Sequence, residues 1–249
     1  MEYTVSYKDQ ASLHIQDEIG SMAMELFKRI SDGLDVAFKE NRKFNIALSG
    51  GSTPVQLFEY LAGSQNNFEN WENMNIFWGD ERGVPPDHPE SNYGNAWNSL
   101  LKHLNIPGEN IFRIRGEDDP LKESARYAKE LTKIRDYEGI PAFDLTLMGI
   151  GEDGHTASIF PGRMDLLEST SWVAETKHPE TNQIRITLTG RILNNSENIL
   201  FLVRGRSKRK VINHIFTDSI EARAYPAYHI RPRGRLEWLI DNDAAEDLG

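Results

Sequence analysis

The residues best suited to proton transfer lie between Gly149 and Gly162, in the stretch Gly-Ile-Gly-Glu-Asp-Gly-His-Thr-Ala-Ser-Ile-Phe-Pro-Gly. His155 is the proton carrier of this stretch, because an unperturbed imidazole titrates near neutral pH, at about 6.5. Asp153 precedes it across Gly154, so in a turn both side chains could face one cavity, with the carboxylate orienting the imidazole. A lone histidine is more often structural, but the glycine-rich setting after an apolar run favours a catalytic base.

A second polar segment, Ser49-Gly50-Gly51-Ser52-Thr53, also follows an apolar run and precedes a helical pattern. Its glycines would let a phosphate approach the backbone, and the N–H groups and hydroxyls of a helix start could donate to that phosphate. The segment is not a P-loop, because no Gly-Lys-Ser/Thr follows at the required spacing. The alternative is an ordinary turn, in which Thr53 caps the helix and Pro54 occupies its first position.

Charged side chains gather in a third segment, Gly79-Asp80-Glu81-Arg82, at the end of another apolar run. Arg82 could hold a phosphate or carboxylate through two parallel hydrogen bonds. Asp80 could accept hydrogen bonds from sugar hydroxyls or act as a base. The alternative for such a run is a solvated ion cluster at the surface. Asn92, which follows a proline-rich loop, could either cap a helix or bind a ligand.

Two more basic residues could bind an anion. Arg185 places a charge inside the strand pattern from Ile184 to Leu188, where the alternative is a side chain facing outward. Lys208 follows another apolar strand, at the start of an expected helix, and could be a second phosphate ligand. The alternative for Lys208 is a solvated basic surface, because the same segment holds Arg204, Arg206, Arg209 and Lys210.

The elements that must position these residues alternate between apolar strands and helices. We expect strands at 44–48, 75–78, 111–114, 143–148, 184–188 and 199–203, and helices at 15–34, 55–62, 91–104, 120–134 and 208–216. Such continuously apolar strands favour an α/β fold with a mainly parallel sheet. Parallel sheets collect ligands beyond the carboxyl ends of their strands, so segments 49–53, 79–82 and 149–158 should converge. No linker or repeat interrupts the pattern, which predicts a single α/β domain over residues 1–249.

The composition of the 249 residues limits the class of protein. A net charge of −10 argues against a nucleic-acid partner, since phosphate backbones are bound by basic surfaces. The absence of cysteine excludes disulfides and thiolate chemistry, and the scattered histidines have no metal-ligand spacing. No nucleophile elbow of the Gly-x-Ser-x-Gly type is present. No signal sequence and no apolar run of about 18 residues is found, so we expect no membrane partner and a cytoplasmic location.

Taken together, these motifs resemble the 6-phosphogluconolactonase family. The resemblance runs from about residue 44 to the C-terminal region and is carried by Leu48–Pro54, Trp78–Pro85, His88–Tyr93, Gly149–Gly162, Arg185–Thr187, Phe201–Gly205 with Lys208, and Pro226-Ala227. Asp-Gly-His-Thr-Ala-Ser combined with Gly-Asp-Glu-Arg is the specific part, whereas Ser-Gly-Gly alone would not be.

The resemblance implies a modified Rossmann-like fold, shared with glucosamine-6-phosphate deaminases and ribose-5-phosphate isomerases. It also implies hydrolysis of 6-phospho-D-glucono-1,5-lactone to 6-phosphogluconate, in the pentose phosphate pathway, without a cofactor or metal. His155 would be the general base that activates water, and whether Asp80, Glu81 or Asp153 assists it is open. Around the phosphorylated sugar lactone would lie Ser49, Gly50, Gly51, Ser52, Thr53, Arg82, Asn92, Arg185 and Lys208. The sequence leaves the oligomeric state open.

Two rival functions remain. A glucosamine-6-phosphate deaminase usually has Asp-Glu-Tyr where this chain has Asp80-Glu81-Arg82, and Asp-Gly-His-Ile-Ala-Phe-Asn-Glu where it continues Thr156 to Gly162. The missing glutamate removes a partner for ring opening and favours the lactonase. A sugar-phosphate sensor without catalysis is the other alternative, and the presence of both Asp153 and His155 argues against it.

Overall fold

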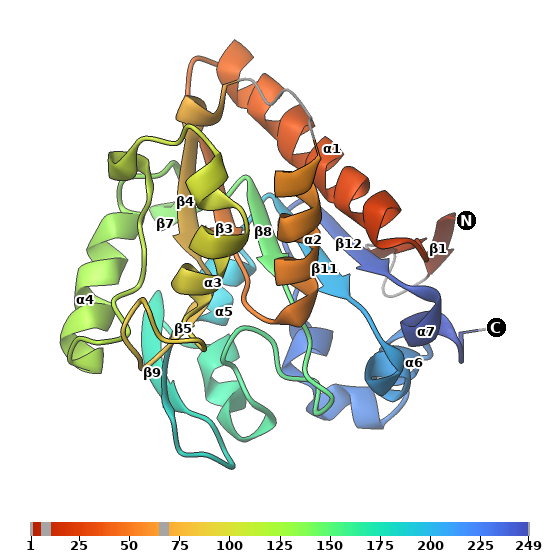
Figure 1. The fold of residues 1–249 in the computed structure, drawn as a ribbon. Coiled ribbons are helices and arrows are strands. Elements are labelled where there is room, and N and C mark those ends of the chain that lie inside the picture. The colour runs from red at the N-terminus through yellow and green to blue at the C-terminus, as the bar shows by residue number, and fades with distance from the viewer. Residues whose placement is uncertain (1, 6–10, 65–69, 249) are drawn as a thin grey trace.

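The computed structural model describes residues 2–5, 11–64 and 70–248. Within them, the main sheet is seven-stranded and consists of β1 (Glu2–Val5), β2 (Ala11–Ile15), β3 (Phe44–Leu48), β4 (Met74–Trp78), β8 (Leu145–Met148), β11 (Asn198–Val203) and β12 (Arg235–Ile240). The strand order is β1-β2-β12-β11-β8-β3-β4, and every neighbouring pair is parallel except β1 with β2 (Figure 1). The predicted α/β fold with a mainly parallel sheet is therefore confirmed.

A smaller antiparallel sheet lies beside the main one and has the order β5-β10-β9. Its strands are β5 (Asp80–Arg82), β9 (Val173–Lys177) and β10 (Ile184–Leu188), and a separate hairpin joins β6 (Asp136–Tyr137) to β7 (Ile140–Pro141). The strand predicted at 184–188 is thus confirmed, but it pairs with the short charged segment after β4. This pairing brings Arg185 opposite Arg82.

The helices are α1 (Ile19–Lys39), α2 (Ser52–Gly63), α3 (Asn92–Ser99), α4 (Pro120–Leu131), α5 (Gly190–Leu193), α6 (Arg209–Phe216) and α7 (Asn242–Ala245). Short 3-10 segments lie at Trp71–Asn73, Leu101–His103, Gly108–Asn110, Pro161–Leu167, Arg206–Lys208, Glu221–Ala224 and Pro226–His229. Helices α1, α2 and α3 pack side by side in front of the sheet in Figure 1. The apolar stripe of α1 faces inward and buries Met22, Leu26, Ile30 and Leu34.

Side chains cap two of the helices, and a third cap expected from the sequence is not formed. The side chain of Ser91 accepts a hydrogen bond from the Gly94 N–H, and that of Asp119 accepts one from the Lys122 N–H, so both residues cap helices. The cap predicted at Thr53 is wrong, because α2 begins earlier, at Ser52, after Gly51. Gly51 has a φ of 103°, which glycine adopts without strain.

Three element predictions need correction. Ile15 ends strand β2 rather than beginning a helix, because α1 starts only at Ile19. Residues 111–114 form no strand and contribute a single parallel bridge, between Ile111 and Ile76. Strands β1, β2, β5, β6, β7, β9 and β12 were not predicted. Part of their hydrogen bonding comes from strands distant in the chain, as between β12 and β2 or between β5 and β10.

The outer edge of β4 is covered, which fixes the end of the strand that precedes Asp80. The Phe112 N–H donates to the carbonyl of Ile76 at 2.8 Å. The Tyr127 hydroxyl of α4 accepts from the Trp78 N–H at 2.8 Å and donates to the Trp78 carbonyl at 2.9 Å. An edge strand leaves such backbone groups unpaired, and these contacts satisfy them.

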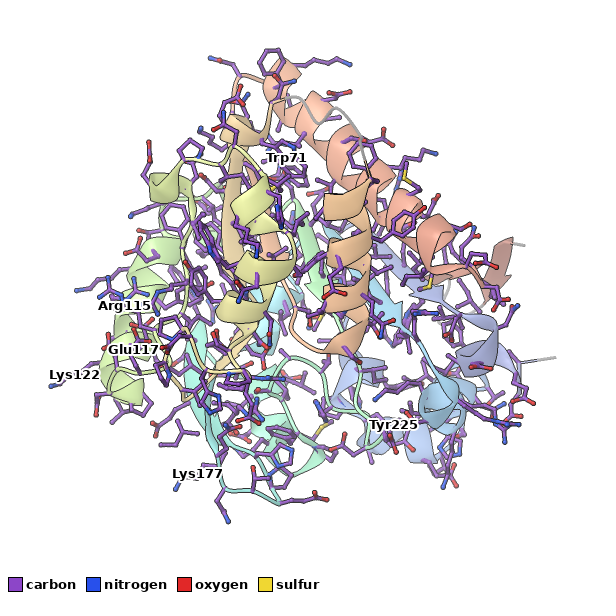
Figure 2. All side chains as sticks on the ribbon, viewed as in Figure 1. Trp71, Arg115, Glu117, Lys122, Lys177 and Tyr225 are labelled. Carbon is purple, nitrogen blue, oxygen red and sulfur yellow. The ribbon has the colours of Figure 1, made fainter. Side chains whose placement is uncertain are left out.

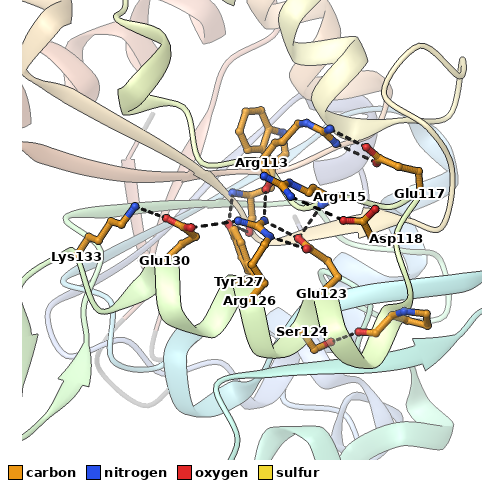
Figure 3. Close-up of polar contacts among 12 residues, drawn as sticks. Arg113, Arg115, Glu117, Asp118, Glu123, Ser124, Arg126, Tyr127, Glu130 and Lys133 are labelled. Carbon is orange, nitrogen blue, oxygen red and sulfur yellow. Dashed lines mark hydrogen bonds and ion pairs between the residues drawn. The ribbon is translucent and has the colours of Figure 1, made fainter.

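An ion-pair network fastens α4 beside this edge (Figure 3). Arg126 pairs with the buried carboxylate of Glu123 at 2.6 Å and with Glu130 at 3.2 Å. In the neighbouring loop, Arg113 pairs with Glu117 through two hydrogen bonds. Arg126 also donates to the carbonyl of Arg113, so the network ties the helix to the loop. The role of the network is therefore to hold α4 in place.

Candidate active site

The predicted convergence of the motifs is found at one edge of the main sheet. The neighbouring strands β11, β8, β3 and β4 are parallel, so their carboxyl ends meet at the edge that points down in Figure 1. A cavity of about 210 Å³ opens there, which we call the strand-end cavity. Its lining combines the loops after all four strands: Ser49, Gly50, Gly51, Ser52, Thr53, Pro54, Asp80, Arg82, Gly149, Ile150, Gly151, His155, Ala157, Leu202, Val203, Arg204 and Lys208.

His155 lines this cavity and is paired with Asp153. The His155 Nδ1 lies 2.6 Å from Asp153 Oδ1, and the same oxygen accepts from the His155 backbone N–H at 3.1 Å. Burial raises the pKa of Asp153, but the hydrogen bond and charge of His155 outweigh it, so this pKa is lowered. Because Nδ1 is hydrogen-bonded to the carboxylate, Nε2 is the ring nitrogen that can contact a substrate or water.

The shape of the loop depends on its glycines. A Cβ on Gly151 would lie 2.1 Å from His155 Nδ1, so the imidazole rests directly on the Gly151 backbone. Gly151 donates its N–H to the carbonyl of His155 at 2.9 Å, which closes the loop onto itself. The His155 ring also packs against Phe160 at a centroid distance of 4.9 Å. The imidazole is therefore in contact with both a glycine backbone and an aromatic ring.

The hydroxyl groups of the same motif point into the protein rather than into the cavity. Thr156 is buried and donates to the carbonyl of Gly149 at 2.8 Å. Ser158 is also buried and donates to Asp80 Oδ2 at 2.6 Å. Asn92 Nδ2 donates to the other carboxylate oxygen of Asp80 at 3.1 Å. Asp80 lines the cavity, but both of its oxygens are engaged by neighbouring side chains.

Glu81 is almost completely buried and organises the segment that follows β4. Its carboxylate accepts from the backbone N–H groups of Arg82, Asn92 and Tyr93 and from the Ser91 hydroxyl. Burial raises the pKa of Glu81, and the backbone hydrogen bonds act against this rise. The carboxylate thereby joins β5 to the start of α3, which places Asn92 beside Asp80.

The Ser49–Thr53 loop ends at the start of α2, where the helix presents its N–H groups to the cavity. A Cβ on Gly50 would lie 1.7 Å from Asn92 Oδ1, so the Asn92 amide packs directly against the loop backbone. Asn92 is outside the set of described residues that line the cavity. Asn92 therefore connects the Ser49–Thr53 loop to Asp80 without being a described lining residue of the cavity.

The cations are divided between the cavity and its surroundings. Arg82, Arg204 and Lys208 line the cavity, whereas Arg185 is not one of its described lining residues. Arg185 is the direct partner of Arg82 across β10 and β5. Burial lowers the pKa of Arg185, and the neighbouring charge of Arg82 lowers it further.

Arg204 also lines the cavity, although the sequence pattern singled out only Lys208 in this basic segment as a candidate ligand. Its Nη1 donates to Gln56 of α2 at 2.5 Å, and its Nε lies 3.5 Å from the carboxylate of Asp241. Asp241 also accepts from the Gly205 N–H, which fixes the turn between β11 and Lys208. The position of Arg204 directly after a buried strand, before a glycine, was the only signal for this placement.

Neither a metal site nor a membrane-spanning helix is found among the described residues. Histidine, aspartate and glutamate side chains form no group of three that could hold a metal ion in residues 2–5, 11–64 and 70–248. In the same residues, no helix is both long and apolar enough to pass through a bilayer.

Comparison with known proteins identifies the family. A sequence model described as glucosamine-6-phosphate isomerases/6-phosphogluconolactonase matches residues 17–238. The chain belongs to this family. It is 42% identical over 212 residues to a 6-phosphogluconolactonase of Haemophilus influenzae, covering 84% of this chain and 89% of the relative. The resemblance seen in the motifs is thus confirmed, as is the prediction of an enzyme.

Solved structures agree. The crystal structure of devB protein is 37% identical to this chain, with a TM-score of 0.88 and coverage of 96% of this chain and 100% of the other. The 6-phosphogluconolactonase of Thermotoga maritima is 28% identical, with a TM-score of 0.79 and coverage of 93% and 100%. A monomeric glucosamine-6-phosphate deaminase of the NagB superfamily has a TM-score of 0.76 at 22% identity, covering 94% and 98%. That last likeness confirms the fold predicted to be shared with the deaminases.

Proposed function

We propose that the protein hydrolyses 6-phospho-D-glucono-1,5-lactone to 6-phospho-D-gluconate, with His155 as the general base that activates water. The observation that carries this proposal is the His155–Asp153 pair, 2.6 Å apart, in a cavity that also contains Arg82, Arg204 and Lys208. A base beside cations suits an anionic substrate with an electrophilic carbonyl. The names of the relatives agree with the lactone as substrate.

The chemistry needs no covalent nucleophile, because a δ-lactone is already a reactive ester. His155 Nε2 takes a proton from water as the water oxygen bonds to the lactone carbonyl carbon. The tetrahedral intermediate then collapses, the bond from that carbon to the ring oxygen breaks, and the proton on His155 passes to the departing oxygen. Asp153, which is hydrogen-bonded to Nδ1, stabilises the imidazolium between these steps.

The phosphate is proposed to lie between the start of α2 and the segment containing Arg204 and Lys208. Helix N–H groups and the Ser52 and Thr53 hydroxyls suit a phosphate oxygen. The hydrogen bond from Arg204 to Gln56, in the second turn of α2, supports this arrangement because it joins the two segments. Lys208 supplies a further cation from the same cavity.

Arg82 is proposed to face the sugar end of the cavity, where it would stabilise negative charge on the carbonyl oxygen. It comes from the opposite side of the sheet edge from Lys208, after β4 rather than after β11. The residues proposed to hold the sugar end of the cavity in its shape are Arg185, Asn92 and Asp80. Asp80 is given a positioning role, since Ser158 and Asn92 already donate to its two oxygens.

The decisive experiment follows lactone hydrolysis as acid release from freshly made substrate, after subtraction of the spontaneous reaction. His155→Ala should lower kcat by about 10²–10⁴-fold, which is the usual contribution of general-base catalysis, with little change in folding. A matched control is His178→Ala, because His178 packs on Phe160 as His155 does but is outside the described cavity lining. Near-normal turnover in His155→Ala would reject the mechanism.

Two further measurements, made beside the lactone assay, separate the rival functions. Release of ammonia from glucosamine 6-phosphate would assign the protein to the deaminases. Binding of 6-phosphogluconate without lactone turnover in the wild type would indicate a sensor. Lactone turnover that depends on His155 would reject both alternatives.

A further inference from the structure

Tyr225 covers the loop that holds Asp153 and His155, although the mechanism above does not use it. A Cβ placed on Gly154 would lie 2.3 Å from Tyr225 Cγ and 2.4 Å from its Cβ and Cδ1. Gly154 has a φ of +81°, in the left-handed region that favours glycine. The base of the Tyr225 ring therefore occupies the space of a side chain at position 154, between the two members of the proposed catalytic pair.

The peptide unit between Gly154 and His155 is held at both ends. Its carbonyl, on Gly154, accepts a hydrogen bond from the Ala227 N–H at 3.1 Å. Its N–H, on His155, donates to Asp153 Oδ1 at 3.1 Å. The orientation of this peptide sets the direction in which the His155 side chain leaves the backbone. Residues 225–227 thus act on the backbone that aims the imidazole.

The far end of Tyr225 is anchored in α6. Its hydroxyl lies 2.9 Å from His214 Nδ1, and the two rings are nearly parallel, at 7°, with centroids 5.9 Å apart. Helix α6 begins directly after Lys208. Tyr225, labelled in the lower right part of Figure 2, therefore connects the loop of the base to the helix that follows a proposed phosphate ligand.

We propose that Tyr225 is a positioning residue for the His155–Asp153 pair. Its ring packs on Gly154 and keeps the imidazole at the strand-end cavity, and its hydrogen bond to His214 adds a smaller restraint on the ring. This inference rests on the proposed role of His155 as the base. Displacing a reacting group by about 1 Å can cost up to about 10²-fold in rate, so a small movement of the loop matters.

The ring and the hydroxyl of Tyr225 make separable contributions. The atoms that approach Gly154 are Cβ, Cγ and Cδ1, which phenylalanine shares. Tyr225→Phe should consequently keep the loop in place and lose only the contact with His214. Tyr225→Ala removes the ring and frees the loop, although it leaves the cations of the cavity untouched.

The test measures kcat and KM for fresh 6-phosphogluconolactone, with kcat corrected for the folded fraction from circular dichroism. Tyr225→Ala should lower kcat by about tenfold or more and change KM by less than about twofold. Tyr225→Phe, in contrast, should have a kcat within about threefold of the wild-type value. A matched control is Tyr228→Phe, which removes a hydrogen bond to Asp218 in the neighbouring 3-10 segment and should leave kcat unchanged.

Several results would overturn the inference. One is a wild-type kcat in folded Tyr225→Ala, and another is a Tyr225→Phe variant as slow as Tyr225→Ala. If Tyr225→Ala does not fold, Tyr225→Val, which lacks Cδ1 and the ring, takes its place, with the same expected loss and the same contradicting result. His155→Ala, measured in parallel, separates the two proposals. Normal turnover in that variant rejects the mechanism, whereas a slow His155→Ala beside a normal Tyr225→Ala rejects only the positioning role.

Discussion

Arg82 and Arg185 lie directly opposite each other on neighbouring antiparallel strands, β5 and β10. Residues in such a register place their side chains on the same face, where like charges repel. The Nε atoms of both guanidinium groups are buried, with no hydrogen-bond partner among the described residues. An anion near Arg82, such as the carboxylate of 6-phosphogluconate, would relieve this repulsion, which agrees with the place proposed for Arg82 at the sugar end of the cavity.

Neutralising Arg185 should therefore stabilise the ligand-free protein while weakening its response to a ligand. We expect Arg185→Gln to raise the free energy of unfolding by about 0.2–1 kcal/mol, the usual size of a cross-strand pair effect. The increase in thermal midpoint on adding 6-phosphogluconate should be smaller than in the wild type. Thermal unfolding with and without this compound measures both quantities.

Lys177→Gln is the control for Arg185→Gln, because Lys177 lies on β9 opposite Ile184 rather than opposite a cation. It removes the same charge without relieving a like-charged pair. An Arg185→Gln variant that is less stable than the wild type, and that responds fully to 6-phosphogluconate, would contradict the electrostatic explanation.

Arg204 should contribute to binding of the phosphorylated substrate. Its guanidinium is fixed by Gln56 and Asp241 at the cavity, so it is already ordered when an anion arrives. We expect Arg204→Gln to raise KM for 6-phosphogluconolactone about tenfold, the loss of one charge-assisted hydrogen bond, with little change in kcat. KM for the lactone without phosphate should stay the same, and steady-state kinetics on both substrates measures this.

The matched control is Arg206→Gln. Arg206 belongs to the same basic segment, but it pairs with Glu246 and is outside the described lining of the cavity. Equal changes in KM for Arg204→Gln and Arg206→Gln would show that the effect comes from removing a positive charge anywhere in this segment. That result would remove Arg204 from the proposed phosphate site.

Glu237 should make the stability of the fold depend on pH. Burial raises the pKa of Glu237, but hydrogen bonds from His14 and Arg29 and the charge of Arg29 outweigh it and lower this pKa to about 2. A lowered carboxyl pKa means that the folded state favours the charged form. The stabilisation is complete above the ordinary value of 4.5 and is lost as the pH falls toward 2.

Glu237→Gln should consequently lower the free energy of unfolding at pH 7 by about 1.5–3 kcal/mol, the usual value of hydrogen bonds to a charged group. Urea unfolding from pH 7 to pH 2.5 should show the variant and the wild type converging below about pH 4.5. Glu246→Gln, which alters an exposed carboxylate, should change the midpoint little across this range. A difference for Glu237→Gln that stays constant with pH would contradict the role assigned to its charge.

The sequence alone determined the fold class and the edge of the sheet where the site lies. Continuous apolar runs such as 44–48 and 199–203 can be buried on both faces only in a covered, mainly parallel sheet. Motifs that directly follow such runs must then meet at one edge, as the loops containing Ser49, Asp80 and His155 do. Both predictions depend only on the types of neighbouring residues and on their spacing along the chain.

Tertiary structure decided which side chains in those motifs reach the cavity. Ser158 and Asn92 turned out to hold Asp80, and the adjacency of Arg185 to Arg82 arose from pairing between strands more than a hundred residues apart. Arg204, which was not among the predicted ligands, lines the cavity because Gln56 and Asp241 hold it there. Such contacts depend on the packing of segments distant in the chain, and neither spacing nor residue type along the chain specifies them.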